Sequence, residues 1–154
     1  MSDPVIEASE RGWIAEHRNE YLKDGEAAHV WDSTVAGGPG PVPTLLLFTT
    51  GRKSGKESIM PLIYGKVDDG YAIIASKGGT PTHPGWFHNL RAQGTVKIKV
   101  ANDEFEADTR VASGDEREKI WSQMADMFPP YTNYKKSAGD REIPVVVLKP
   151  KGSS

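Results

Sequence analysis

A small, mostly antiparallel β-barrel with peripheral helices is the fold class that this sequence predicts. About six short apolar or alternating runs are separated by turn residues, as expected for strands of an all-β fold. The runs follow one another as hairpins and do not alternate with helices, which disfavours a parallel α/β arrangement. Glycine (16 residues) and proline (11 residues) are both frequent, which suits many short strands and turns.

The 154 residues predict one domain, residues 1–154, with an N-terminal helix, a linker and a barrel core at 44–150. The helix is expected at about 5–22, because apolar and aromatic residues recur there at near-helical spacing. Gly25 lies just beyond its end. The segment DSTVAGGPGPVP, 32–43, is rich in turn residues and is expected to be the linker.

The first three strands of the core are expected at 44–50, 58–67 and 71–76. TLLLFTT is a continuous apolar run, which indicates a buried strand. GRKSGKE is a turn, and Pro61 in the following strand suggests an edge or a bulge. Asp68-Asp69-Gly70 is typical of a hairpin turn before YAIIAS.

The second half predicts two helices and three further strands. Residues 80–90 form a loop that leads into a short helix, and strands follow at 95–101 and 104–111. TVKIKVA alternates apolar and basic residues, so one of its faces is expected to meet water. Ser113 and Glu116 predict a capping box for a helix with Ile120, Trp121, Met124 and Phe128 on one side. Residues 129–141 are expected to be a loop, and 143–149 the last strand.

Composition excludes several classes of function. Cysteine is absent, which rules out disulfides, thiolate metal sites and cysteine nucleophiles. No apolar run is long enough for a transmembrane segment, and the N-terminus lacks the pattern of a signal peptide. His83 and His88 are five residues apart, which is not the spacing of a helical zinc pair, so no metal site is predicted. The sequence contains no basic helix and no sheet motif that combines basic and aromatic residues, so nucleic-acid binding is not predicted.

Charge is unevenly distributed along this chain of net charge −2. Residues 51–99 carry eight basic and three acidic side chains, whereas residues 1–32 carry three basic and eight acidic ones. A basic middle in an acidic protein indicates a local anion site, although an ordinary solvated surface is the alternative.

The turn GRKSGK is the first candidate site. It resembles a phosphate loop, but the spacing between its glycines is one residue short of a Walker A motif, and a strand follows it. The turn still places a fixed fork of arginine donors and exposed backbone amides together, which suits phosphate or carboxylate. An ordinary basic hairpin is the alternative. The candidate binding residues are Arg52, Lys53, Ser54, Gly55 and Lys56.

The stretch ASKGGTPTHPGWFHNL, 75–90, is the second candidate site. It begins where a predicted strand ends, and its glycine pair permits a close approach of the backbone to a ligand. A well-packed turn with a core tryptophan is the alternative. The candidate residues are Ser76, Lys77, Gly78, Gly79, Trp86 and Asn89.

Tyr131 and Tyr134 form a third candidate group, after a proline pair. Their hydroxyls could donate to a substrate oxygen, or the rings could pack as amphipathic surface aromatics.

Taken together, these motifs resemble the deazaflavin-dependent nitroreductase family, actinobacterial enzymes that use coenzyme F420. The resemblance covers about 45–150 and depends on TTGRKSG, SKGG and HPxWxxNL together, with ERxxxW and DREIPVVVLKP further on. It implies an FMN-binding-like split β-barrel with about six antiparallel strands. The two basic and glycine-rich segments would form the wall and floor of a cofactor groove, and the basic residues would meet the anionic phosphodiester and polyglutamate tail.

The implied reaction is hydride transfer from the reduced deazaflavin to a quinone or another electron-poor acceptor, such as a nitroaromatic compound. Tyr131, Tyr134 and Ser76 are the implied catalytic residues, with a tyrosine donating to the oxygen that gains charge. Two alternatives stay open on this fold, an FMN-dependent reductase and a non-catalytic cofactor carrier. A cytoplasmic protein is expected, with peripheral association at the inner face of the membrane left open, as is the oligomeric state.

Two positions depart from the family's pattern. Members often carry a further basic residue shortly after the GRKSG turn, where this chain has Glu57-Ser58. Some members place a tyrosine before the proline pair, where this chain has Phe128. These departures favour quinones over nitroimidazoles as acceptors.

Overall fold

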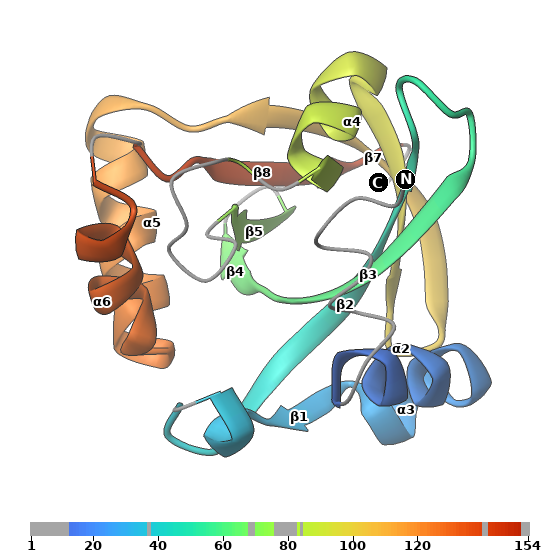
Figure 1. Ribbon diagram of the computed structural model, residues 1–154, viewed down its shortest axis with the longest axis horizontal. Helices are drawn as coiled ribbons and strands as arrows, with labels where there is room; N and C mark the ends of the chain where they lie inside the picture. Colours follow the sequence, from blue (N-terminus) through green and yellow to red (C-terminus); the bar gives the residue numbers. More distant parts are fainter. Residues whose placement is uncertain are drawn as a thin grey trace.

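An eight-stranded antiparallel sheet that curls on itself forms the centre of the molecule (Figure 1). The computed structural model describes residues 13–36, 38–67, 70–75, 83, 85–139 and 142–151. The strand order is β1-β2-β6-β7-β8-β5-β4, and β3 pairs with β2 outside this path. The strands are β1 (Val30–Asp32), β2 (Pro41–Thr50), β3 (Glu57–Ile63), β4 (Gly65–Val67), β5 (Gly70–Ile74), β6 (Thr95–Val100), β7 (Asp103–Val111) and β8 (Val145–Pro150). This architecture confirms the predicted fold class.

The helices of the described residues lie around the sheet in three groups. α2 (Trp13–Lys23) and α3 (Gly25–Ala28) lie near one end of β2, and α4 (Gly85–Gln93) lies towards the other end (Figure 1). α5 (Gly114–Met127) and α6 (Pro130–Ser137) lie side by side on the flank formed by β4, β5 and β8. A 3-10 helix, η1 (Ser33–Ala36), joins β1 to β2.

The interior of the curled sheet is one apolar core. Because side chains alternate across a strand, every second residue of β2, β6 and β8 points into it. Leu45 and Leu47, Val96 and Ile98, and Val146 and Leu148 are all buried there, together with three residues of α4. α4 therefore closes this core with Trp86, Phe87 and Leu90.

Two further apolar clusters lie on the outer faces of the sheet. The opposite residues of β5 and β8 pack against α5 and α6, where Met124 is fully buried. Leu46 and Phe48 of β2 pack with Tyr21 and Ala28 from the N-terminal helices. The three clusters explain why residues 45–48 of β2 and 145–148 of β8 are apolar at every position, since both faces of these strands are covered there.

Hydrogen bonds fix α2 to the sheet. The Tyr21 hydroxyl donates to the Thr44 carbonyl at 2.8 Å and accepts from the Ala101 amide at 2.7 Å. Burial raises the pKa of Tyr21 to about 12. His17 lies 2.9 Å from the Ala28 carbonyl oxygen, and burial lowers its pKa. α2 corresponds to the part of the predicted helix at 5–22 from Trp13 onward, and residues 5–12 lie outside the described residues.

Much of the segment 32–43 belongs to regular elements. Pro41–Pro43 belong to β2 and pair with Val30–Asp32 of β1, and η1 lies between them. The predicted strand at 58–67 is divided at Tyr64, whose amide donates to the Pro43 carbonyl at 3.2 Å. These two features raise the strand count from about six to eight, and the proposed Asp68-Asp69 turn lies outside the described residues.

Three local predictions in the second half are wrong. Residues 130–137 form α6 and not a loop, because Pro130 suits a first helical turn and Tyr131 and Tyr134 give it an inward-facing side. Ser113 precedes α5 without a side-chain capping bond, and the Glu116 carboxylate instead pairs with the Arg110 guanidinium. Lys99, expected on the wet face of its strand, is only 8% exposed.

Candidate functional site

The basic turn, residues 51–56, connects β2 to β3 and exposes its charged side chains. The Gly51 amide donates to the Lys56 carbonyl at 2.8 Å, and the Gly55 amide donates to the Gly51 carbonyl at 2.9 Å. Gly55 has a φ of 72°, which favours glycine at this position. Arg52, Lys53 and Lys56 are exposed around this closed turn. The two backbone hydrogen bonds and the conformation of Gly55 therefore close the turn, and its three cationic side chains are left exposed to solvent.

Asn89 of α4 joins the basic turn to the barrel. Its Oδ1 accepts from the Arg52 amide at 3.1 Å and from the Arg52 Nη1 at 3.0 Å. Its Nδ2 donates to the Thr49 hydroxyl at 3.5 Å. Asn89 is only 7% exposed. The structure thus brings together two candidate residues that lie 37 positions apart in the sequence.

Gln93 is a further candidate site residue, which the sequence reasoning missed. Its Oε1 accepts from the Thr50 amide at 2.6 Å, at the point where β2 leaves its pairing with β6. Gln93 lies one helical turn after Asn89, so both amides face the same strand end. That i, i+4 spacing in α4 was the available signal, although it has meaning only once the helix is known to lie beside β2.

Trp86 belongs to the interior core. Its side chain is 5% exposed and packs edge-on against Phe87, with 6.5 Å between ring centroids. The indole therefore fixes α4 to the barrel and offers little surface to a ligand. A core tryptophan was the alternative that the sequence left open for this position.

Ser76, Lys77, Gly78 and Gly79 lie outside the described residues. The strand that precedes them is well defined. The Ala75 amide donates to the Pro144 carbonyl at 3.0 Å, and Ala75 is fully buried in the interior core. Its neighbour Ile74 packs in the outer cluster that contains Tyr131. β5 thus ends between the core that holds Trp86 and the cluster that holds Tyr131.

Tyr131 and Tyr134 lie together on α6, with 6.2 Å between ring centroids. Tyr131 is 4% exposed and also contacts Phe128 and Trp121. Burial, with a smaller contribution from Tyr134, raises the pKa of the Tyr131 hydroxyl above its usual range. Burial also raises the pKa of the half-buried Tyr134. Both phenols are therefore protonated donors at neutral pH. No contact with the basic turn is seen within the described ranges.

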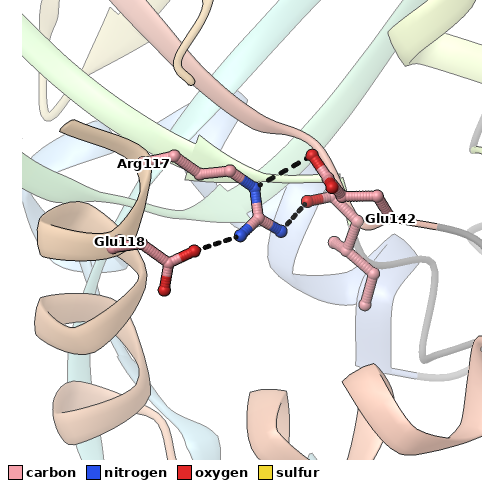
Figure 2. A network of polar contacts seen from close by, with 4 residues as sticks. Arg117, Glu118 and Glu142 are labelled. Carbon is pink, nitrogen blue, oxygen red and sulfur yellow. Dashed lines mark hydrogen bonds and ion pairs between the residues drawn. The ribbon is translucent and has the colours of Figure 1, made fainter. Parts of the chain in front are cut away.

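A buried arginine fixes the flank that carries these tyrosines (Figure 2). The Arg117 Nη2 donates to the Ile143 carbonyl at 2.9 Å, and Nη1 donates to Glu118 at 3.2 Å. The Glu142 carboxylate lies 3.4 Å from Nε, and the guanidinium lies 5.5 Å from the Trp121 ring centroid. These contacts join the two sequence motifs ERxxxW and DREIPVVVLKP, which meet only in the fold.

Fold and site together define a class, a small antiparallel β-barrel protein with an exposed cationic turn suited to an anionic ligand. The sequence profile of the F420H(2)-dependent quinone reductase family matches residues 22–150. An F420H(2)-dependent quinone reductase of Mycobacterium tuberculosis is 40% identical over 113 residues, which is 71% of this chain and 75% of that protein. The chain belongs to the F420H(2)-dependent quinone reductase family and is an oxidoreductase by that membership.

Solved structures agree with this membership. An F420H2-dependent reductase, FDR-A, has a TM-score of 0.63 and 38% identity, covering 70% of this chain and 94% of its own. A chain described as a domain-swapped dimer has a TM-score of 0.65 and 32% identity, covering 88% and 96%. HutZ, the haem storage protein of Vibrio cholerae, shares the fold at 16% identity, a TM-score of 0.55 and coverage of 71% and 82%. The FMN and carrier alternatives are not favoured.

Proposed function

We propose that this protein reduces a quinone with electrons from reduced F420. The observation that carries the proposal is the exposed basic turn, held against α4 by Asn89, in a member of a family that is named for F420H2. The cofactor's phosphodiester and polyglutamate tail are anionic. Arg52, Lys53 and Lys56 offer cationic donors to such groups, and the turn exposes them without any acidic partner among the described residues.

The proposed binding set comprises two segments of the chain. The basic turn would hold the anionic tail through its side chains and through the backbone around Ser54 and Gly55. The second segment, which precedes α4 in the sequence, would approach the ring system, with glycine providing room for close backbone contact. The residues proposed to form the F420 site are Arg52, Lys53, Ser54, Gly55, Lys56, Ser76, Lys77, Gly78 and Gly79, with the buried Trp86 and Asn89 contributing from α4.

When bound, reduced F420 supplies a hydride for two-electron reduction of an acceptor. The chain's own part is to bind, to orient and to donate a proton or hydrogen bond to the acceptor oxygen. The half-buried Tyr134 is proposed for that donation, together with its buried neighbour Tyr131 and with Ser76 as a third polar group. Burial raises the pKa of each phenol, so both stay protonated and can donate a hydrogen bond, whereas transfer of the proton itself becomes less favourable.

A quinone is the preferred acceptor, and nitroaromatic compounds are the second one. Phe128 is an apolar ring at a position where some family members have a tyrosine. Its ring centroid lies 4.9 Å from that of Tyr131. That difference supports quinones over nitroimidazoles. None of the described helices is long and apolar enough to cross a membrane. A cytoplasmic location is proposed, with access to lipid-borne quinone from the inner face of the membrane. The domain-swapped relative supports testing for a dimer.

The first test is a titration of the purified protein with F420 and, in parallel, with FMN, followed by fluorescence. Tight F420 binding and weak FMN binding are expected, and reduced F420 should then be oxidised when menadione is added. FMN binding without F420 binding would overturn the proposal. F420 binding without quinone turnover would instead support a carrier.

A second test addresses the proton donor. Tyr131→Phe keeps the ring packing of α6 and removes the hydroxyl, so we expect at least a tenfold loss of quinone turnover with unchanged F420 affinity. Tyr134→Phe is the matched variant on the same helix. Unchanged turnover in both variants would exclude the two tyrosines as donors.

A further inference from the structure

The Asn89 side chain is almost fully engaged inside the protein. A carboxamide offers one oxygen with two lone pairs and one nitrogen with two hydrogens. Both lone pairs of Oδ1 are used by Arg52, through its amide and its Nη1. One hydrogen of Nδ2 is used by Thr49, which is itself 2% exposed. With 7% of its surface exposed, Asn89 has little capacity left for a ligand.

Arg52 has the opposite balance. Its side chain is exposed, and a guanidinium carries five donor hydrogens in a fixed plane. Within the described ranges, Asn89 takes one of them and no carboxylate pairs with the group. The guanidinium is therefore held at one nitrogen while its remaining donors stay available for an anion. Its orientation is set from inside the barrel, because α4 is fixed there by Trp86, Phe87 and Leu90.

We propose that Asn89 is a positioning residue that presents the Arg52 guanidinium to an anionic group of the cofactor and does not bind the cofactor itself. This inference rests on the proposed function and assigns Asn89 a different role from direct contact. The physical benefit is preorganisation. A free arginine side chain loses rotamer freedom when it binds an anion, and a hydrogen bond that already fixes one end reduces that loss.

A double-mutant cycle on F420 affinity tests the inference. The variants are Arg52→Met, Asn89→Leu and the double variant, with affinity measured by fluorescence in the complete chain. If Asn89 acts through Arg52, each single change weakens binding, and Asn89→Leu adds less than a twofold loss once Arg52 is gone. Losses that multiply would show that Asn89 has its own contact with the cofactor and would overturn the inference.

The dependence of F420 affinity on ionic strength provides a second measurement on the same variants. An arginine–anion contact at the surface is screened by salt, so its removal makes binding less dependent on ionic strength. Arg52→Met should lower this dependence, whereas Asn89→Leu should weaken binding with a smaller change in it, because the Arg52 charge remains. Arg91→Met is the matched control, because it removes the same charge from an exposed position on α4 that does not contact Asn89. Equal effects of Arg91→Met and Arg52→Met would also overturn the inference.

A measurement without cofactor keeps the inference testable if Asn89→Leu does not fold. In the unliganded wild-type protein, amide hydrogen exchange should be at least tenfold slower at Arg52 than at its exposed neighbour Lys53. Equal exchange at the two amides would mean that Asn89 does not hold the turn. If the wild-type protein does not bind F420, the proposed function is overturned. If it binds F420 but the losses of affinity in the two single variants multiply, only the inference about Asn89 is overturned.

Discussion

Arg52 and Arg117 show how the same side chain takes opposite roles in two regions of the molecule. Arg52 lies on an exposed turn and is held at one nitrogen by the buried Asn89. Arg117 is 8% exposed, and each of its three nitrogens faces an oxygen of Ile143, Glu118 or Glu142 (Figure 2). The first arrangement leaves charge available to a ligand, whereas the second uses the charge within the protein.

The two arginines differ in burial: Arg52 is exposed and contacts a buried asparagine, whereas Arg117 is itself buried. A buried neutral amide orients Arg52 and leaves its charge uncompensated. Arg117 is itself buried, so its charge requires compensation by oxygen atoms nearby. Its Nε is the least satisfied atom, since the Glu142 carboxylate is close enough for an ion pair but forms no hydrogen bond with it. We therefore expect Arg117 to govern stability and Arg52 to govern affinity.

The largest expected effect is the loss of stability in Arg117→Met. Methionine keeps much of the packing against Trp121 but leaves the Ile143 carbonyl without its donor. We expect the free energy of unfolding to fall by about 2–4 kcal/mol. Thermal and urea denaturation would measure this, with Arg52→Met as the matched control. A stability loss below that of Arg52→Met would contradict the structural role of Arg117.

Arg52→Met should produce the converse result. Removing a charge-assisted contact with an anion is expected to weaken F420 binding about tenfold or more, while the midpoint of thermal unfolding stays nearly unchanged. Fluorescence titration and thermal denaturation of one preparation would measure both quantities. The comparison of the two regions fails if Arg117→Met, although folded at the assay temperature, loses as much affinity as Arg52→Met.

The stability of the protein should depend on alkaline pH through Tyr131 of α6. Tyr131 has a raised pKa in the folded protein, so the unfolded chain releases its phenol proton first as pH rises above about 10. Its contribution to stability is complete below pH 10 and is lost above it, by about 1 kcal/mol at pH 11. Tyr131→Phe should therefore lose less stability than the wild type between pH 9 and pH 11 in urea denaturation. Parallel curves for the two proteins would contradict this.

The smallest expected effect belongs to Gln93→Met, which removes the acceptor of the Thr50 amide at the start of the basic turn. Both residues are exposed, so water replaces much of the lost bond. We expect F420 affinity to fall about two- to fivefold and stability to change by less than about 1 kcal/mol. Gln93→Glu keeps an acceptor oxygen and serves as the matched variant in amide exchange at Thr50. Identical exchange in Gln93→Met and the wild type would remove Gln93 from the site.

Local patterns predicted those elements whose burial is visible along the chain. The apolar run at 44–50 and the alternating run at 95–101 both became strands, and Ile120, Trp121, Met124 and Phe128 are buried on one side as expected. The errors occurred where a distant partner decides the outcome. Glu116 was expected to cap its own helix but pairs with Arg110, and α6 was expected to be a loop because its apolar side is only two tyrosines wide.

By itself, the sequence determined the strand-rich fold class and the basic turn, because each depends on residues that are close together in the chain, and it indicated the family through several short motifs taken together. Glycine at a positive φ, alternating apolar residues and a run of cations act over a few positions. Tertiary structure alone decided which partners orient Arg52 and which compensate the charge of Arg117. Asn89 reaches Arg52 across 37 positions, and Ile143 reaches Arg117 across 26. Such contacts depend on how the helices pack on the sheet, and burial then sets whether a charge is compensated or available.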